Sequence, residues 1–383
     1  MVVKLELTED LREARHHLHA HPERSFEEHA TTRYLEERLR AMGIEPLPNP
    51  MDTGVVAQVD GERPGPLIGL RADIDGLPIR EDTGLDFASV NDGTMHGCGH
   101  DLHMASLLGA ARWLAAHRDA LAGSVRLVFQ PAEELGQGAR AVIDAGLVDG
   151  VEAMVGTHNN PNYAPGTVAA GTDPMMAGCV RFKVELDAEG THAAYPHKGT
   201  GPLEAMSSMV MSLQTIVSRN ASPFRPLVVS VTEMHSGDVW NVVPAHAGFQ
   251  GTCRYFHRED GDLAAARFRA IVEDTARAYG IGARVDWDDF QGPLASDPAL
   301  IAPVVAEVPR YATLAPIYPS MAGEDFAEYG KVAPLVFAFI GSNGRPGCAD
   351  WHSPRFVGLD EAVATGASFY ANAAMTVLDT LRG

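Results

Sequence analysis

The sequence predicts an α/β protein in which a larger domain with a mainly parallel, helix-flanked sheet is interrupted by a smaller α+β domain. Two observations lead to this expectation. Short continuous apolar runs alternate with helical periodicity in the first part of the chain and again in its last quarter. Between these parts the pattern changes to apolar–polar alternation, which is typical of strands with one exposed face.

The first part of the chain is expected to begin with two helices within its first 45 residues. In the second helix, Ser25 and Glu28 have the spacing of a capping box, and Gly43 follows its end. Apolar strands are then expected at residues 66–70, 124–130 and 151–156, with helices at 102–117 and 139–145. Apolar strands that alternate with helices indicate a largely parallel, buried sheet.

The middle of the chain has the order strand–helix–strand–strand–helix–strand. The strands are expected at residues 179–186, 227–234, 245–256 and 283–288, and the helices at 202–218 and 263–279. This order over about 110 residues is typical of a ferredoxin-like domain. A strand at 335–340 and a helix at 361–381 return to the first pattern. We therefore expect one domain of residues 1–178 and 292–383, with residues 179–291 inserted as a second.

Composition excludes several classes of function. The 383 residues include 50 Asp and Glu against 30 Lys and Arg, a net charge of −20, so nucleic acids and anionic membranes are not expected partners. No apolar run reaches the roughly 18 residues of a membrane span. The first residues lack the apolar core of a secretory signal, and four scattered cysteines fit a reducing compartment. We expect a cytoplasmic protein that acts on small molecules.

Potentially reactive side chains gather at the ends of the expected strands. They follow a strand or precede a helix, and they are Asp75, Cys98, His100, Glu133, Glu134 and His158. In open α/β sheets, sites form beyond the carboxyl ends of the strands. Taken singly, each has an ordinary structural interpretation: Asp in a turn, Cys as a small buried apolar residue, Glu at a helix start.

Taken together with His352, these residues predict a metal site. Thiolate, imidazole and carboxylate in one set suit Zn²⁺, Mn²⁺ or Co²⁺ better than Mg²⁺ or Ca²⁺. One catalytic ion seldom takes five protein ligands, so two ions are expected for the set Cys98, His100, Glu134, His158 and His352. Glu133 is then left as a base. The chain has no G-x-S-x-G elbow, P-loop, G-x-G-x-x-G after a strand, or HExxH helix, which disfavours the corresponding catalytic and nucleotide-binding classes.

The order of several motifs identifies a family resemblance. The motifs are RADIDGLPI, MHGCGHDLHMASLLGAA, VFQPAEELGQGA, GTHNNP, THAAYPHKG, NVVPAHAGFQGTCRYF, MAGEDFAEY and WHSPRF. In them the chain resembles the carboxypeptidase-G/aminoacylase-type metallopeptidases, in particular the amidohydrolase branch with hippurate hydrolases and indole-acetyl-amino-acid hydrolases. The similarity extends over nearly the whole chain, from the segment His19, His21, Pro22, Glu23 to the last helix.

The resemblance implies a two-metal catalytic domain with an inserted lid and dimerisation domain. It implies that the five residues named above are metal ligands, that Glu133 is the general base, and that Asp75 orients a histidine ligand. Other branches have a histidine where Asp73 stands and an aspartate bridge where Cys98 and His100 stand, which suggests that the Cys98 thiolate bridges the metals. The metal is left open between Mn and Zn, with Co and Ni as further alternatives.

The resemblance also implies roles for three residues of the inserted domain. His192 would reach the active site of a partner subunit and support the oxyanion, while Asn241 and Arg254 would hold a substrate carboxylate. Their ordinary alternatives are a turn cap, a turn residue and a strand-surface arginine. Glu324 and Asp325 match a further motif and would hold the site loop or one end of the substrate. A homodimer or higher homo-oligomer is implied in the same way.

The expected reaction is hydrolysis of an amide whose leaving amine is an amino acid with a free carboxylate. Two substrates remain open. An N-acyl-amino acid would make the enzyme a deacylase, whereas a free dipeptide would make it a dipeptidase and would require an acidic partner for a buried ammonium, which Glu324 or Asp325 could supply. A metal-free binding or scaffold protein is a third reading, against which the retention of Glu133 and of all five ligands argues.

Overall fold

The computed structural model describes all 383 residues, which divide into two compact units. The large unit comprises Met1–Asp173, Ala295–Tyr318 and Asp325–Gly383, and the inserted unit comprises Pro174–Leu294 and Pro319–Glu324. The expected inserted domain of residues 179–291 is therefore extended at both ends and joined by a short later segment. Backbone bridges from Met176 to Leu294 and to Ser320 account for both extensions. No helix combines the length and apolar character needed to cross a membrane.

The large unit is built on a seven-stranded sheet with the order β1-β3-β2-β4-β13-β5-β12. Its strands are β1 (Val55–Asp60), β2 (Arg63–Asp73), β3 (Ala122–Gln130), β4 (Ala153–Asn160), β5 (Thr167–Ala169), β12 (Thr313–Ala315) and β13 (Leu335–Gly341). The four neighbours β3, β2, β4 and β13 are parallel, while β1 pairs antiparallel with β3 at one edge. The predicted mainly parallel sheet is confirmed, but the edge strand β1 was not recognised from the sequence.

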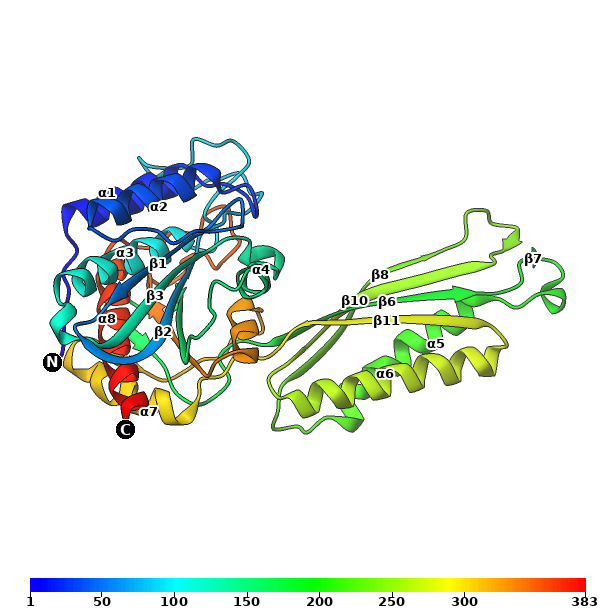
Figure 1. Cartoon of the computed structure of the whole chain (residues 1–383). Coiled ribbons are helices and arrows are strands. Elements are labelled where there is room, and N and C mark those ends of the chain that lie inside the picture. The colour runs from blue at the N-terminus through cyan, green and yellow to red at the C-terminus, as the bar shows by residue number, and fades with distance from the viewer. The chain divides into compact units, whose positions relative to one another are not determined.

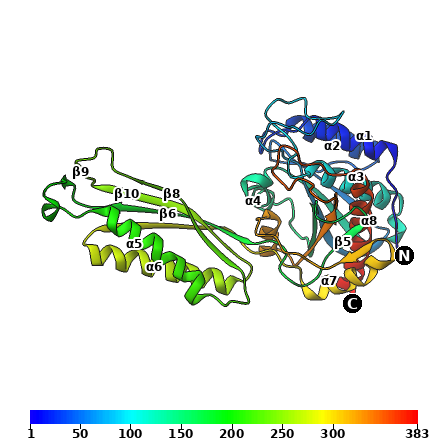
Figure 2. The ribbon, with the colours of Figure 1, turned by 180° about the vertical axis from the view of Figure 1, so that it is seen from behind.

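Helices cover both faces of this sheet (Figures 1 and 2). They are α1 (Glu9–Ala20), α2 (His29–Ala41), α3 (His100–Ala116), α4 (Gly138–Asp144), α7 (Pro298–Glu307) and α8 (Glu361–Arg382). Because β3 lies on one side of β2 and β4 on the other, right-handed crossovers place α3 and α4 on opposite faces. This double cover explains why every residue of β4 and β13 is buried.

Helices α3 and α8 pack unusually closely on one face. A Cβ atom at Gly109 would lie 2.9 Å from the Cβ of Ala367, and one at Gly366 would lie 2.4 Å from the Oγ of Ser106. The two glycines therefore permit a close helix–helix approach. This approach buries α3 almost entirely and fixes the position of its first residue, His100.

The inserted unit is a four-stranded antiparallel sheet with two helices on one face (Figure 1). Its main elements are β6 (Gly178–Asp187), α5 (Pro202–Thr215), β8 (Leu227–Ser236), β10 (His246–Tyr255), α6 (Arg258–Tyr279) and β11 (Gly282–Gln291), with a small ribbon of β7 (Thr191–His192) and β9 (Val242–Val243). The strand order β11-β6-β10-β8 is that of a ferredoxin-like fold, which confirms the expectation.

Side-chain periodicity explains why these segments form this layer. Along β10 buried and less buried residues alternate, and along α6 the buried Ala264, Phe268, Val272 and Ala276 recur every fourth residue. The ring centroids of Phe182 on β6 and Phe268 lie 4.6 Å apart, so sheet and helix share one apolar core.

The predicted capping box at the start of α2 is wrong. Glu28 stands at the N-cap, but its side chain makes no capping hydrogen bond. The carboxylate of Glu23 instead accepts hydrogen bonds from the N–H groups of Ala30 (3.0 Å) and Thr31 (2.7 Å). Ser25 and Glu28 do not cap the helix because their side chains form hydrogen bonds elsewhere. The Ser25 hydroxyl donates to Asp75, and the Glu28 carboxylate accepts from the N–H of Ala132.

Candidate metal centre

The carboxyl ends of the parallel strands bring the expected ligands to one edge of the sheet in the large unit. Glu134 follows β3 in a short 3₁₀ turn (Glu133–Leu135), and His158 lies near the end of β4. Cys98 lies in the loop before α3, His100 is the first residue of α3, and His352 comes from the loop before α8. The five side chains thus come from four separate regions of the chain.

The ligand atoms of these five residues form two overlapping triplets. Cys98, His100 and His158 form one, and Cys98, Glu134 and His352 form the other, with all ligand atoms of a triplet within 4.8 Å of one another. The Cys98 Sγ lies 3.4 Å from the His158 Nε2, and the His352 Nε2 lies 3.4 Å from the Glu134 Oε2. Cys98 is the member that the two triplets share.

The histidines of the first triplet are oriented by hydrogen bonds on their outer nitrogens. The Nδ1 of His158 lies 2.7 Å from the carbonyl oxygen of Asn159, and the Nδ1 of His100 lies 2.9 Å from that of Asp75. Each Nδ1 therefore donates outward, and each Nε2 faces the centre of the cluster, where it would bind a cation in its unprotonated form.

Two buried polar atoms at the centre have no hydrogen-bond partner: the Nε2 of His100 and the Oε1 of Glu134, which lie 3.9 Å apart. Buried polar atoms are nearly always paired, so two orphaned atoms that face each other require an explanation. A divalent cation bound to both would supply the missing partner. The residues present therefore fit a metal centre, and their mixed S, N and O donors fit a transition metal.

The electrostatics of the cluster favour a bound cation as well. Burial and the charges of Asp75 and Asp73 raise the pKa of Glu134 to about 7, although His100 opposes this. Burial disfavours the His100 imidazolium, but the charges of Asp73 and Asp75 outweigh it and raise the pKa of His100 to about 10. Burial holds the pKa of His158 well below its usual value. Several carboxyl groups thus lie around the centre, and His158 stays neutral and able to bind a metal ion.

Asp75 connects the ligands to the rest of the fold. Its carboxylate is fully buried and accepts hydrogen bonds from the N–H groups of Glu133 (3.1 Å) and Glu134 (3.0 Å) and from the Ser25 hydroxyl (2.6 Å). It also lies 3.3 Å from the Nδ1 of His100. Asp75 therefore orients the ligand His100 directly. It also fixes the turn that carries the ligand Glu134.

Glu133 lies beside the cluster without belonging to the five ligands. The residue is 8% exposed, and its Oε2 is 4.0 Å from the Nε2 of His100. The residue before it, Ala132, and the ligand His352 both adopt positive φ angles, 54° and 61°. Such backbone conformations are unfavourable for residues other than glycine and gather at functional sites.

A buried ionic network behind the cluster was not recognised from the sequence. Arg71 is fully buried and donates to Asp73 (2.7 Å) and to Asp325 (2.8 Å). Asp325 also accepts from Gln130 (2.8 Å) and from the N–H of Ala139 (2.9 Å). Of the two roles expected for Asp325, these contacts agree with that of holding a loop of the site in place. The only signal that the sequence offered for Arg71 was its place as the first residue of the motif RADIDGLPI.

His103, for which the sequence suggested no role, completes this network toward the ligands. Its Nδ1 lies 2.5 Å from the Asp73 Oδ1, and its Nε2 accepts the N–H of Asn159 (2.8 Å). Asp73 therefore holds His103, and His103 holds the backbone next to His158. The spacing of three between His100 and His103, which places both on one face of α3, could have indicated this relation.

The three expected substrate residues lie in the inserted unit, which does not bring them together. His192 on β7 is exposed and pairs with Val242, and the N–H of Ala193 donates to the carbonyl of Asn241 (3.1 Å). Arg254 lies at the far end of β10, opposite Cys179. Since a strand rises about 3.4 Å per residue, about 27 Å of β10 separates Arg254 from the end next to β9.

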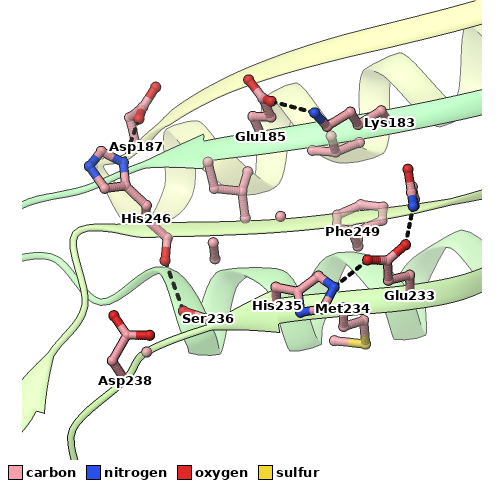
Figure 3. Close-up of a pocket in the computed structure, with 16 residues that line it drawn as sticks. Lys183, Glu185, Asp187, Glu233, Met234, His235, Ser236, Asp238, His246 and Phe249 are labelled. Atoms are coloured by element: carbon pink, nitrogen blue, oxygen red, sulfur yellow. Dashed lines mark hydrogen bonds and ion pairs between the residues drawn. The ribbon is translucent and has the colours of Figure 1, made fainter.

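The open face of the inserted sheet carries a hollow of about 840 Å³ (Figure 3). Its charged side chains neutralise one another: Lys183 lies 2.8 Å from Glu185, His246 lies 2.9 Å from Asp187, and His235 bonds to Glu233. These pairs are largely exposed, in contrast to the mostly buried cluster of the large unit. The hollow therefore offers no second reactive set.

Comparisons with known proteins agree with the geometry. Residues 69–376 match the model of the peptidase family M20/M25/M40. The N-acetyl-L-cysteine deacetylase of Bacillus subtilis is 44% identical over 96% of this chain and 88% of its own, and the thermostable carboxypeptidase 1 of Saccharolobus solfataricus is 33% identical over 93% and 92%.

A solved structure is similar along its whole length. It is a dinuclear metal-binding peptidase of the M20 family from Bacillus subtilis, with a TM-score of 0.88, 36% identity, and coverage of 97% of this chain and 98% of that one. The expected family, fold and hydrolase class are confirmed. The chain belongs to the M20/M25/M40 peptidase family, and it is a metal-dependent hydrolase of amide or peptide bonds.

Proposed function

We propose that the protein is a two-metal amidohydrolase that releases an amino acid from an N-acyl-amino acid. The observation that carries the proposal is the pair of ligand triplets that share Cys98, with the buried carboxylate of Glu133 beside them. The deacetylase relative at 44% identity supports an acyl substrate, and the dinuclear peptidase supports two ions. The four free cysteines support a reducing, cytoplasmic location.

The ligands in this proposal are Cys98, His100, Glu134, His158 and His352. Cys98 would contribute to both ion sites, because it is the only residue that the two triplets share. Two divalent ions there, Mn²⁺ or Zn²⁺ with Co²⁺ or Ni²⁺ as alternatives, would supply an activated water and Lewis-acid polarisation of the amide carbonyl. Asp75 keeps His100 and the turn of Glu134 in place through the hydrogen bonds described above.

Glu133 serves as base and then as acid. Its carboxylate takes a proton from the attacking water and later delivers it to the departing amine, so that one group serves both steps. Burial of the side chain keeps bulk water from competing for that proton. The N–H of Asp325 lies 3.3 Å from the Glu133 Oε1, which holds the carboxylate in a fixed orientation.

The inserted unit is assigned to substrate binding. Arg254 and Asn241 would hold the free carboxylate of the substrate, and His192 would donate to the oxyanion. Because one inserted unit separates Arg254 from His192 and Asn241 by most of the length of β10, one small substrate would have to receive them from two chains. We therefore include a homodimer or higher homo-oligomer in the proposal, with β8, one of the two edge strands of the inserted sheet, available for association.

The dipeptidase alternative is less well supported. It requires an acidic side chain free to meet the ammonium of a dipeptide. Asp325, one of the two candidates, is fully buried and engaged by Arg71, Gln130 and Ala139. The carboxypeptidase among the relatives keeps the alternative open to test.

The test compares hydrolysis of N-acetyl- and N-benzoyl-amino acids with hydrolysis of the matching free dipeptides, using metal-loaded enzyme with and without chelator. Chelator-sensitive release of amino acid from the acylated set alone is the expected result. Release mainly from the dipeptides would replace the deacylase assignment by a dipeptidase. Turnover that survives complete removal of metal would contradict both.

A further inference from the structure

The residue that precedes Glu133 has a conformation that needs support. Ala132 has φ 54° and ψ 40°, in the left-handed region that residues with a Cβ rarely adopt. It is fully buried and lies between strand β3 and the turn of Glu133 and Glu134. Its backbone torsions therefore set the direction in which both carboxylates leave the sheet edge.

Three successive N–H groups at this turn point at carboxylates of the chain. Those of Glu133 and Glu134 donate to the two oxygens of Asp75, as described above. The N–H of Ala132 donates to the Oε1 of Glu28 at 2.9 Å. Successive N–H groups around a left-handed residue form a hollow that holds anions, and here two internal carboxylates occupy it.

Burial of the Glu28 carboxylate carries a large desolvation free energy. Its side chain is 0% exposed, and burial together with the charge of Asp75 raises its pKa to about 7. A carboxylate in such surroundings is unfavourable unless its hydrogen bonds compensate for the lost water. The hydrogen bond to the N–H of Ala132 is a contact of this kind.

The segment that carries Glu28 is itself fixed against the metal centre. The N–H of Gly76 donates to the carbonyl of Glu23 (2.7 Å), and the hydroxyl of Ser25 donates to Asp75 (2.6 Å). Phe26, which follows Ser25, also has a positive φ of 63°, a conformation that persists only where the surrounding contacts hold it. The backbone that carries Glu28 is therefore held in place, and its carboxylate is positioned to accept the N–H of Ala132.

We propose that Glu28 is a positioning residue, whose carboxylate holds the N–H of Ala132 and so maintains the left-handed turn that aims Glu133 and Glu134. The kinetic part of its test rests on the proposed function of those two residues. The structural part does not, because it measures the turn itself.

The first experiment compares Glu28→Ala and Glu28→Gln with Glu27→Ala, which removes an exposed carboxylate from the same segment. Amide hydrogen exchange of the segment Pro131–Gln137 is measured in the metal-loaded proteins, together with kcat and KM on an N-acetyl-amino acid. In Glu28→Ala the segment exchanges at least about tenfold faster and kcat falls by at least about tenfold, with KM nearly unchanged. Glu28→Gln keeps an acceptor oxygen and stays close to wild type, as does Glu27→Ala.

The second experiment adds Ala132→Gly to Glu28→Ala. Glycine adopts the left-handed conformation without steric penalty, so the double variant recovers part of the lost kcat. The proposal is overturned if Glu28→Ala exchanges and turns over as wild type does, if Glu28→Gln is as impaired as Glu28→Ala, or if Ala132→Gly restores nothing. Should wild type fail to hydrolyse N-acyl-amino acids, the proposed function fails, while the exchange comparison still decides the role of Glu28.

Discussion

The two units of this protein place their polar residues in opposite ways. In the large unit, most of the reactive side chains are buried at the carboxyl edge of a parallel sheet, with His352 exposed, and neighbours orient two of the histidines: Asn159 orients His158, and Asp75 orients His100. In the inserted unit, His192 is exposed on a two-residue strand and the charged pairs of the sheet lie in water. The large unit therefore gathers its reactive side chains into one cluster, whereas the inserted unit leaves its polar side chains exposed to solvent.

This difference explains how much could be predicted from the sequence. Parallel strands must end at a common edge, so polar residues that follow apolar runs could be assigned to one site, and Cys98, His100, Glu134, His158 and His352 are indeed brought together. The alternation along β10 and the spacing of Phe268 in α6 likewise sufficed for the ferredoxin-like layer.

Other features depended on contacts that no local pattern contains. Ser25 and Glu28 fit a capping box, but their side chains bond to Asp75 and Ala132, which are 50 and 104 residues away. The bond between Arg71 and Asp325 spans 254 residues. A rule based on local spacing, such as the capping box, does not include partners that are distant in the sequence. Hydrogen bonds to such partners can take the place of a helix cap.

The largest expected effect concerns Glu133 in the large unit. Glu133→Gln keeps the size of the side chain and removes the proton acceptor, so kcat is expected to fall about 10³-fold while metal content and KM stay near wild type. Steady-state kinetics and elemental analysis measure this. Glu134→Gln is the matched comparison, in which metal content falls as well. A Glu133→Gln enzyme with full metal and a kcat within about tenfold of wild type would refute the base assignment.

In the inserted unit, the sharpest change is Arg254→Lys. Lysine keeps the charge but cannot form the bidentate contact with a carboxylate, so kcat/KM is expected to fall about 10- to 100-fold on an N-acetyl-amino acid. Arg181→Lys on the neighbouring strand, where the arginine only meets Asp288 in an exposed pair, is the control and should change little. An equal loss on the matching N-acetyl-amino acid amide, which lacks the carboxylate, would show that Arg254 has another task.

The smallest effect tests whether a buried ion pair of the large unit sets the pH dependence of stability. Burial opposes the charge on His19, but the charge and hydrogen bond of Asp101 prevail and raise its pKa from 6.5 to about 9. Because the folded pKa is the higher one, this stabilisation is fully present below pH 6.5 and is lost as the pH rises to about 9. It amounts to at most about 3 kcal/mol for this 1% exposed residue.

Denaturant unfolding of wild type and His19→Gln between pH 6 and 9.5 measures this contribution. The difference in unfolding free energy between the two proteins should shrink across that window. His246→Gln, which removes an exposed histidine paired with Asp187 in the inserted unit, is the control for the loss of an imidazole as such. A pH-independent difference for His19→Gln would contradict the assignment of the charge to His19.

The proposed two-metal centre depends on Cys98 as a ligand of both triplets, and the metal content of Cys98→Ala tests this most directly. After loading with Mn²⁺ or Zn²⁺ and gel filtration, elemental analysis should find two ions per chain in wild type and in the control Cys348→Ala. Cys98→Ala should hold fewer than one, because its loss removes a ligand from both triplets. Two tightly held ions in Cys98→Ala would contradict the claim.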